Sequence, residues 1–382
     1  MDLNTSQTII LDNGSGIIKA GLASERIPTC IIQNSVARPK TGDIRSEILI
    51  GASNDLNKLS IKYPMQHGSI IDWNDMERVW QHIYHKKLNL LSEDHPVLFT
   101  EPALNSRNNR EKVIEIFFEK FKVPAMYISI QSILTLYSSG RTTGVVLDCG
   151  DGVSSAVPIY QGFAMTNGIK RIDFAGREVT QYLRMLLKKE GINFQTSADF
   201  EIVKNIKESL CYIGENPIKE ENNIKDTSIF KLPDGRDIEI GPSRFRAAEV
   251  LFRPQFLGRE YDGLHELLCG SIEESDLDLR STLFKNIVLS GGSTLFKGFG
   301  SRLLAELRNI SPKHAQLKIA APKERLYSVW IGGSILASLN TFQDALVSSK
   351  FIKKGEPMLL KCRTRTFYVI IIILSLININ LS

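Results

Sequence analysis

The chain has 382 residues, of which 43% are hydrophobic and 23% charged, the composition of an ordinary soluble globular protein. This length is sufficient for two lobes with separate cores. Much of the formal net charge of +5 lies in residues 344–382, where six Lys and Arg stand against Asp344 and Glu356. The remaining residues show no basic stripe, which argues against a nucleic-acid partner.

The five cysteines are scattered without paired spacing, which fits a reducing compartment and argues against a zinc site. The first residues do not have the pattern of a signal peptide. We therefore expect the protein in the cytoplasm.

The first predicted element is a hairpin at residues 9–21, where an apolar run ends in Asp12 and a second apolar run carries Lys19. Gly14 and Gly16 permit backbone conformations in which successive N–H groups face one concavity, a natural place for phosphate oxygens. Asp12 can hold a magnesium ion through its water shell. Taken alone, the pattern is also that of an ordinary hairpin, and it matches neither the dinucleotide fingerprint nor the Walker loop.

Residues 33–62 are polar and turn-rich, which predicts a small excursion from the main fold. A helix is expected to begin at Asn74, because Glu77 stands three residues later in the capping-box position. Short apolar strands then alternate with amphipathic helices up to the midpoint, the pattern of an α/β lobe. The expected elements are strands at 96–100 and 125–130, a helix carrying Val113, Phe117 and Phe121, and a helix from Gln131 to Gly140.

A second hairpin is predicted at residues 144–164, 136 residues after the first. Again an apolar strand ends in an aspartate, Asp148, and a Gly-x-Gly turn follows at Gly150 and Gly152. Two similar aspartate-tipped turns suggest a duplicated architecture that grips one phosphate chain from both sides.

Helices are expected at 176–190 and 199–212, the second carrying Lys207 and Glu208, which by themselves would be assigned to a solvated helix face. Residues 286–300 predict a strand, a Gly-Gly turn and a helix, so that Gly291 and Gly292 let the backbone approach a flat ring or a ribose. Small residues in 330–337 predict close helix packing.

With these motifs in place, the sequence resembles actin and its relatives from residue 9 to about residue 343. The two hairpins, the Ser-Gly-Gly turn at 290–292 and the segments 63–68, 141–144 and 330–339 carry the likeness. The segments 72–78, 200–204, 238–246 and 286–300 are more similar to the centractin branch of the family, as is Leu326, where conventional actin has Lys.

The resemblance implies an α/β fold of the actin-like ATPase type, shared in outline with sugar kinases and heat-shock chaperones. Two duplicated α/β lobes, divided into four subdomains, would surround a nucleotide cleft. The implied outer lobe is residues 1–138, the inner lobe 139–327, and residues 328–343 return to the outer lobe. Residues 344–382 form a divergent tail.

The family's motifs also imply roles for individual residues. Those expected to bind ATP or ADP are Gly14, Ser15, Gly16, Lys19, Gly150, Asp151, Gly152, Lys207, Glu208, Gly291, Gly292 and Ser293. Asp12 and Asp148 would hold magnesium through water. Gln131 and Asp148 are the catalytic candidates, with Gln131 orienting the water that attacks the γ-phosphate. Phe256 and Leu257 are the candidate filament contact.

The centractin likeness implies a protein that polymerises head-to-tail into the short filament of dynactin, with weak ATPase activity used as a structural switch. Its expected partners are copies of itself, the shoulder, sidearm and end-capping subunits of dynactin, and dynein indirectly. The processes implied are microtubule-based transport, nuclear migration and spindle positioning. The alternatives are a conventional or nuclear actin-type protein and, in another class, a small-molecule kinase on the same fold.

Four departures from the family pattern bear on these expectations. The polar loop between Pro39 and Ile48 is about five residues shorter than in actin, Pro102 and Ala103 are transposed, and Ser155 stands where actin has a histidine that helps to place the hydrolytic water. The fourth is the tail, whose largely apolar run 367–379 falls short of the ~20 residues of a membrane-spanning helix. A gene-model artefact, an interfacial membrane anchor and a divergent folded tail all remain open.

Overall fold

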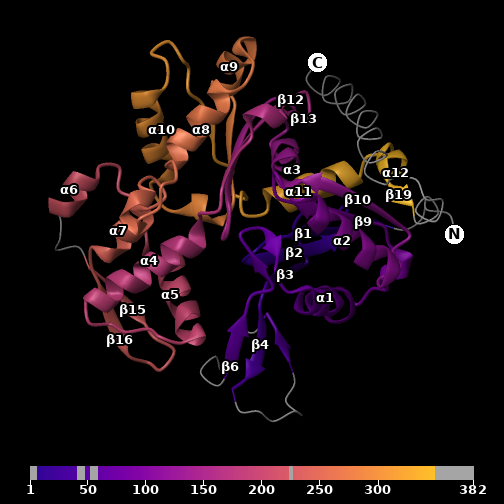
Figure 1. Cartoon of the computed structure of the whole chain (residues 1–382), viewed down its shortest axis with the longest axis horizontal. Helices are drawn as coiled ribbons and strands as arrows, with labels where there is room; N and C mark the ends of the chain where they lie inside the picture. Colours follow the sequence, from indigo (N-terminus) through magenta and orange to yellow (C-terminus); the bar gives the residue numbers. More distant parts are fainter. Residues whose placement is uncertain (1–6, 41–47, 52–58, 223–226, 349–382) are drawn as a thin grey trace.

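The computed structural model describes residues 7–40, 48–51, 59–222 and 227–348. Two mixed β-sheets organise this part of the chain, one in its indigo and purple half and one in its magenta and orange half (Figure 1). The shortened loop after Pro39 and the apolar run 367–379 lie largely or wholly outside the described residues.

The first sheet has six strands in the order β19-β10-β9-β1-β2-β3. β1 pairs antiparallel with β2 and parallel with β9, and β10 continues the parallel part. The strands are β1 (Ile9–Asn13), β2 (Ile17–Leu22), β3 (Cys30–Gln33), β9 (Val97–Glu101), β10 (Ala125–Ile130) and β19 (Val347–Ser348).

The second sheet repeats this plan. β11 pairs antiparallel with β12 and parallel with β17, and β18 continues the parallel part. The strands are β11 (Gly144–Cys149), β12 (Ser154–Tyr160), β13 (Phe163–Ala164), β14 (Lys170–Ile172), β17 (Ile287–Ser290) and β18 (Ile319–Ala320). The α/β fold with a duplicated plan, predicted from the two hairpins, is therefore confirmed.

Helices pack on both sheets, and the described residues also form three small sheets. The helices are α1 (Trp73–His82), α2 (Arg107–Glu119), α3 (Gln131–Ser138), α4 (Gly176–Lys189), α5 (Ser197–Leu210), α6 (Pro217–Asn222), α7 (Ser243–Glu249), α8 (Leu264–Glu273), α9 (Leu277–Phe284), α10 (Phe299–Ile310), α11 (Ser328–Ala337) and α12 (Phe342–Ala345). The small sheets are β4 (Val36–Pro39) with β5 (Leu49–Ile50) and β6 (Leu59–Lys62), β7 (Met65–Gln66) with β8 (Ser69–Ile70), and β15 (Ser228–Lys231) with β16 (Asp237–Ile240).

Each half has its own apolar core. In the first half, Trp80 of α1 is fully buried and its ring lies 5.0 Å from that of Phe117 on α2. In the second half, β11 and β17 bury Leu147 and Leu289 beneath α4, α5 and α8. Because each half has its own core, each can present a surface to the other. The candidate site lies between these two surfaces.

Helix α11 joins the last part of the described chain to the first sheet. A Cβ on Gly332 would lie 1.8 Å from the carbonyl oxygen of Leu134 in α3, and one on Gly333 would lie 2.9 Å from Ile10 Cγ2 in β1. Only glycine permits these approaches, which confirms the close helix packing predicted for 330–337.

Two predicted helix starts were wrong. α1 begins at Trp73, because the Oδ1 of Asp72 accepts from the Asp75 backbone N–H at 3.0 Å and caps the helix. Asn74 is already inside the first turn. After Gly291, the chain forms the 3₁₀ turn Gly292–Leu295 before α10, so the Gly-Gly turn does not open an α-helix directly.

No helix within the described ranges is long and apolar enough to cross a lipid bilayer.

Candidate functional site

The turns of the two aspartate-tipped hairpins meet face to face. A Cβ on Gly16 would lie 2.7 Å from Asp151 Cβ, and one on Gly152 would lie 3.1 Å from the hydroxyl oxygen of Ser15. The Gly68 N–H donates to that hydroxyl at 3.0 Å, which ties the first turn to the β7–β8 hairpin. The approach of one hairpin to the other therefore requires Gly16 and leaves little room for a side chain at Gly152.

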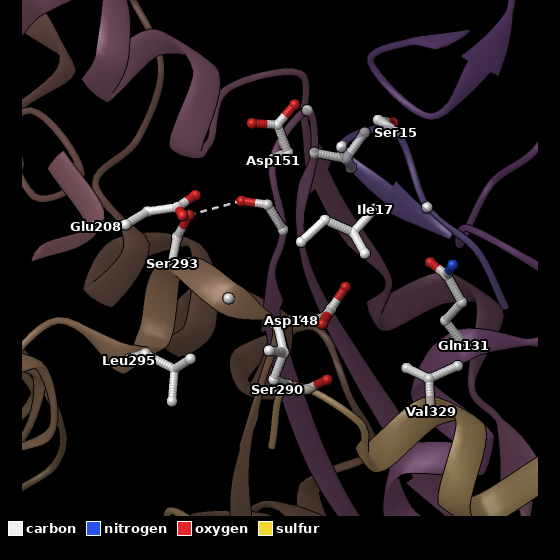
Figure 2. Close-up of a pocket in the computed structure, with 18 of the residues that line it drawn as sticks. Ser15, Ile17, Gln131, Asp148, Asp151, Glu208, Ser290, Ser293, Leu295 and Val329 are labelled. Atoms are coloured by element: carbon white, nitrogen blue, oxygen red, sulfur yellow. Dashed lines mark hydrogen bonds between the residues drawn. The ribbon is translucent and has the colours of Figure 1, made fainter. Parts of the chain in front are cut away.

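A cavity of about 460 Å³ lies along this junction, within the size range of sites for small molecules. Figure 2 shows Glu208, Ser293 and Leu295 at one end, Gln131 and Val329 at the other, and Asp148 between them. All the residues predicted to bind nucleotide or metal, and both catalytic candidates, line this one cavity: Asp12, Gly14, Ser15, Gly16, Lys19, Gln131, Asp148, Gly150, Asp151, Gly152, Lys207, Glu208, Gly291, Gly292 and Ser293. Their individual roles stay predictions.

Asp12 is the centre of a hydrogen-bond network on the first hairpin. It is 1% exposed, and its carboxylate lies 2.8 Å from Lys19 Nζ, directly across the β1–β2 ladder. Thr100 Oγ1 donates to it at 2.8 Å and Gln131 Nε2 at 3.1 Å. The network fixes the Asp12 carboxylate and orients the Gln131 amide at the edge of the cavity.

Asp148 occupies the corresponding place on the second hairpin. Burial raises the pKa of Asp148, the charge of Asp12 raises it further, and a hydrogen bond with Ser290 and the charge of Lys19 oppose the shift. Two carboxylates in one cavity repel each other, so a divalent cation would relieve the cost of ionising both. The donor set is oxygen-rich, as magnesium requires, and therefore fits that ion.

Asp151 is the anchor of a positive cluster. Burial alone would raise the pKa of Asp151, but the charges of Arg177, Lys207 and Lys204 outweigh burial and hold this pKa below its usual value. Arg177 Nη2 lies 3.0 Å from Asp151 Oδ2. Burial lowers the pKa of Lys207, whose Nζ donates to the Gly176 carbonyl at 3.0 Å. An anionic ligand in the cavity would face excess positive charge here.

The strand β17 and the turn that follows it lie at the same end of the cavity as Glu208. Gly291 has φ +87°, and a Cβ there would lie 2.2 Å from the Cys149 carbonyl oxygen, so no other residue fits. The Ser293 hydroxyl donates to the Gly150 carbonyl at 2.6 Å, the dashed line in Figure 2. This turn is thereby fixed against the second hairpin.

Several lining or supporting residues were missed from the sequence. Lys204 lies one helical turn before Lys207, and that spacing was a usable signal. The sequence gives no such signal for Arg177 or Thr100. Arg177 pairs with Asp151 and Thr100 donates to Asp12, and these segments meet only in the folded chain. His67, whose Nδ1 lies 2.9 Å from the Gly152 carbonyl oxygen, also depends on such an approach.

The two predicted filament-contact residues differ in their surroundings. Phe256 is 52% exposed at the 3₁₀ turn Pro254–Leu257, whereas Leu257 packs against the core of the second half. Neither lines the cavity. Of these two residues, Phe256 is the one whose side chain is exposed at the surface.

Comparison with known proteins bears directly on this geometry. The sequence profile of the actin family, described as "Actin", matches residues 3–355. The chain belongs to the actin family. The match continues beyond the 9–343 likeness expected from sequence motifs. An "Actin-like protein" of Neurospora crassa is 52% identical over 355 residues, covering 89% of this chain and 93% of that relative.

Membership of the actin family carries two general properties. Actin-family proteins bind nucleotide with a divalent metal, and they self-associate into filaments. The cavity between the two hairpins has the size and charge pattern for the first property.

Proposed function

We propose that this chain is an ATP-binding, centractin-type actin-related protein that polymerises into the short filament of dynactin. The observation that carries the nucleotide part is the meeting of two aspartate-tipped turns across one cavity. The dynactin part is supported by the centractin-like segments of the sequence, among them 238–246 and 286–300. Its setting would be the cytoplasmic, microtubule-associated cytoskeleton.

In this proposal, the turn residues 14–16 and 150–152, with Lys19, hold the phosphates of ATP. The carboxylates of Asp12 and Asp148 hold magnesium through its water ligands, and the ion supplies neutralisation of phosphate charge. Lys207, Glu208 and the 291–293 turn hold the nucleoside. Gln131, fixed by its bond to Asp12, orients a water towards the terminal phosphate.

We expect hydrolysis to be slow, because Ser155 replaces the water-placing histidine of conventional actin. Ser155 is 5% exposed and stands opposite Asp148 in the β11–β12 ladder, so both side chains share one face of the sheet. Ser155→His should accelerate single-turnover phosphate release by about tenfold, through better placement of the water. Ser155→Ala, the matched control, should leave the rate unchanged. Wild-type release as fast as that of conventional actin would refute the expectation.

Filament assembly needs a head-to-tail contact that does not close on itself. The exposed ring of Phe256 is the proposed apolar contact, and Phe256→Ser should raise the critical concentration for assembly in a sedimentation assay. Gln255, next to it on the same turn, provides the control Gln255→Ala.

The dynactin assignment is tested by affinity purification of the full chain. Co-sedimentation with dynactin shoulder, sidearm and end-capping subunits supports it. Recovery with chromatin-remodelling ATPases, or as long conventional filaments, overturns it in favour of a nuclear or conventional actin. ATP-dependent phosphorylation of a small molecule by the purified chain would indicate the kinase alternative.

A further inference from the structure

Asn34 is a fully buried residue that contacts the glycine turn of the first hairpin. It lies between β3 and β4, where the chain leaves the first sheet for the small β4–β6 sheet, and it is 0% exposed. The Asn34 backbone N–H donates to the Gly16 carbonyl at 3.0 Å, and its side-chain Nδ2 donates to the Gly14 carbonyl at 2.9 Å. One residue therefore binds the carbonyls of both glycines in the turn.

These two hydrogen bonds determine which way the peptide groups of the turn face. In a planar trans peptide, the carbonyl of one residue and the N–H of the next point in opposite directions. Binding of the Gly14 carbonyl by Asn34 therefore directs the Ser15 N–H away from Asn34. The bond to the Gly16 carbonyl does the same for the Ile17 N–H. Ser15 and Ile17 line the cavity, whereas Asn34 does not.

The turn presents unpaired backbone donors. Within the described ranges of the chain, the N–H groups of Ser15 and Gly16 have no hydrogen-bond partner. Both residues are buried and line the cavity. Buried backbone N–H groups are almost always paired in folded proteins, so two unpaired donors in one turn indicate a place for an anionic ligand.

The Asn34 side chain is not explained by the stability of the fold. Its Oδ1 is buried and accepts no hydrogen bond from the part of the chain that the structure describes. The reverse orientation of the amide would place Oδ1 against the Gly14 carbonyl oxygen, so the contact with Gly14 requires Nδ2 to face the turn. A buried acceptor without a partner lowers stability. The contact with the turn is what the amide provides in return.

We propose that Asn34 is a positioning residue for the phosphate-binding turn of the first hairpin. By binding the Gly14 carbonyl, Asn34 keeps that oxygen away from the phosphates and keeps the Ser15 N–H directed at them. Without the amide, the Gly14–Ser15 peptide can rotate, and its carbonyl oxygen would then repel a phosphate. This inference rests on the proposed nucleotide function, and it concerns a residue that does not itself touch the nucleotide.

The test compares ATP with adenosine, which has no phosphate. Equilibrium dialysis of the full chain, freed of nucleotide and supplied with magnesium, gives both dissociation constants. Asn34→Ala removes the amide donor, and Asn34→Leu removes it but keeps a branched side chain of the same outline. Each variant should weaken ATP binding by about tenfold, the effect of losing one well-placed hydrogen bond. The dissociation constant for adenosine should stay within about twofold of the wild-type value, because adenosine does not reach the turn.

Asn286→Ala is the matched control. The Asn286 amide also donates to a backbone carbonyl, that of Thr282 at 3.0 Å, but Asn286 does not line the cavity or contact the turn. This variant should bind ATP and adenosine as the wild type does.

The ratio of the two affinities separates positioning from a general disturbance of the fold. A loss of ATP and adenosine binding to the same extent overturns the inference, and so does unchanged ATP binding in Asn34→Ala and Asn34→Leu. Should Asn34→Ala fail to fold, Asn34→Leu, which fills the space, gives the answer. Failure of the wild type to bind ATP overturns the proposed function and the inference together.

Discussion

At the scale of single residues, the site places two carboxylates in one cavity, with Asp12 buried and Asp148 half-buried. The carboxylate of Asp12 pairs with Lys19 at 2.8 Å. The charge of Asp148 is stabilised mainly by the Ser290 hydrogen bond and less by the charge of Lys19. A buried carboxylate without a close cation destabilises the fold. Without a bound cation, the Asp148 carboxylate is therefore expected to lower the free energy of unfolding. A bound cation would remove this cost.

This arrangement predicts a stabilising but inactivating substitution. Because burial raises the pKa of Asp148, its favourable contribution to folding is present at low pH and is lost as the pH rises through the folded-state pKa. Asp148→Asn should thus raise the free energy of unfolding of the nucleotide-free chain at pH 7.5 by about 1 kcal/mol. The gain should shrink as the pH falls.

Denaturant unfolding at pH 7.5 and 5.5 measures this effect. The exposed Asp237 provides the control, and Asp237→Asn should change stability little at either pH. In Asp148→Asn, magnesium-ATP should no longer stabilise the fold. A variant less stable than the wild type at pH 7.5, or one that keeps the full effect of magnesium-ATP, would contradict the account.

At the scale of elements, glycine positions show which contacts determine the fold. Gly332→Ala would force α11 away from α3, because the added Cβ would lie 1.8 Å from the Leu134 carbonyl oxygen. We expect a loss of about 1–3 kcal/mol in the free energy of unfolding. Gly300→Ala in α10 is the control, since a Cβ there meets no heavy atom within 4 Å and helix propensity favours alanine. Equal stabilities of the two variants would contradict this packing.

The same elements show what the sequence could predict. Both hairpins were predictable because an apolar run, an aspartate and a glycine turn are local signals, and so was their duplication. The start of α1 was missed because Asp72 and Asn74 are both acceptable N-caps. The Asp75 N–H donates to Asp72, and the buried Asp75 side chain pairs with Arg38 of β4. This tertiary contact favours Asp72 as the N-cap. The Arg177–Asp151 pair joins two segments that meet only in the fold, so no local sequence pattern predicts it.

At the scale of the whole molecule, hydrogen bonds join helix α5 of the second half to the end of β3 and to the segment around β6 in the first half. Tyr63 and Gln33 both donate to the buried carboxylate of Glu201, and the Ile61 N–H donates to the Ser197 hydroxyl at 3.2 Å. Arg177 lies 4.4 Å over the Tyr63 ring, which joins these contacts to the Asp151 cluster. The two halves are thus held closed over the site.

Removing the shared carboxylate should therefore loosen the closed form. Glu201→Ala is expected to speed the release of a pre-bound fluorescent ATP analogue by about tenfold, because two hydrogen bonds to a charged group are lost. Asn205→Ala changes an exposed residue of the same helix and should leave release unchanged. A chase with excess ATP measures the rate. Identical rates for Glu201→Ala and the wild type would show that these contacts do not hold the halves together.

The central claim is that two aspartate-tipped turns, one in each half, hold a magnesium-bound nucleoside triphosphate. Its most direct test is the nucleotide content of the native, purified chain, together with the unfolding free energy measured with and without magnesium-ATP. We predict about one adenine nucleotide per chain and a stabilisation of about 2.7 kcal/mol at a ligand concentration one hundred times the dissociation constant. A chain that carries no nucleotide, and whose stability is unaffected by magnesium-ATP, would contradict the account.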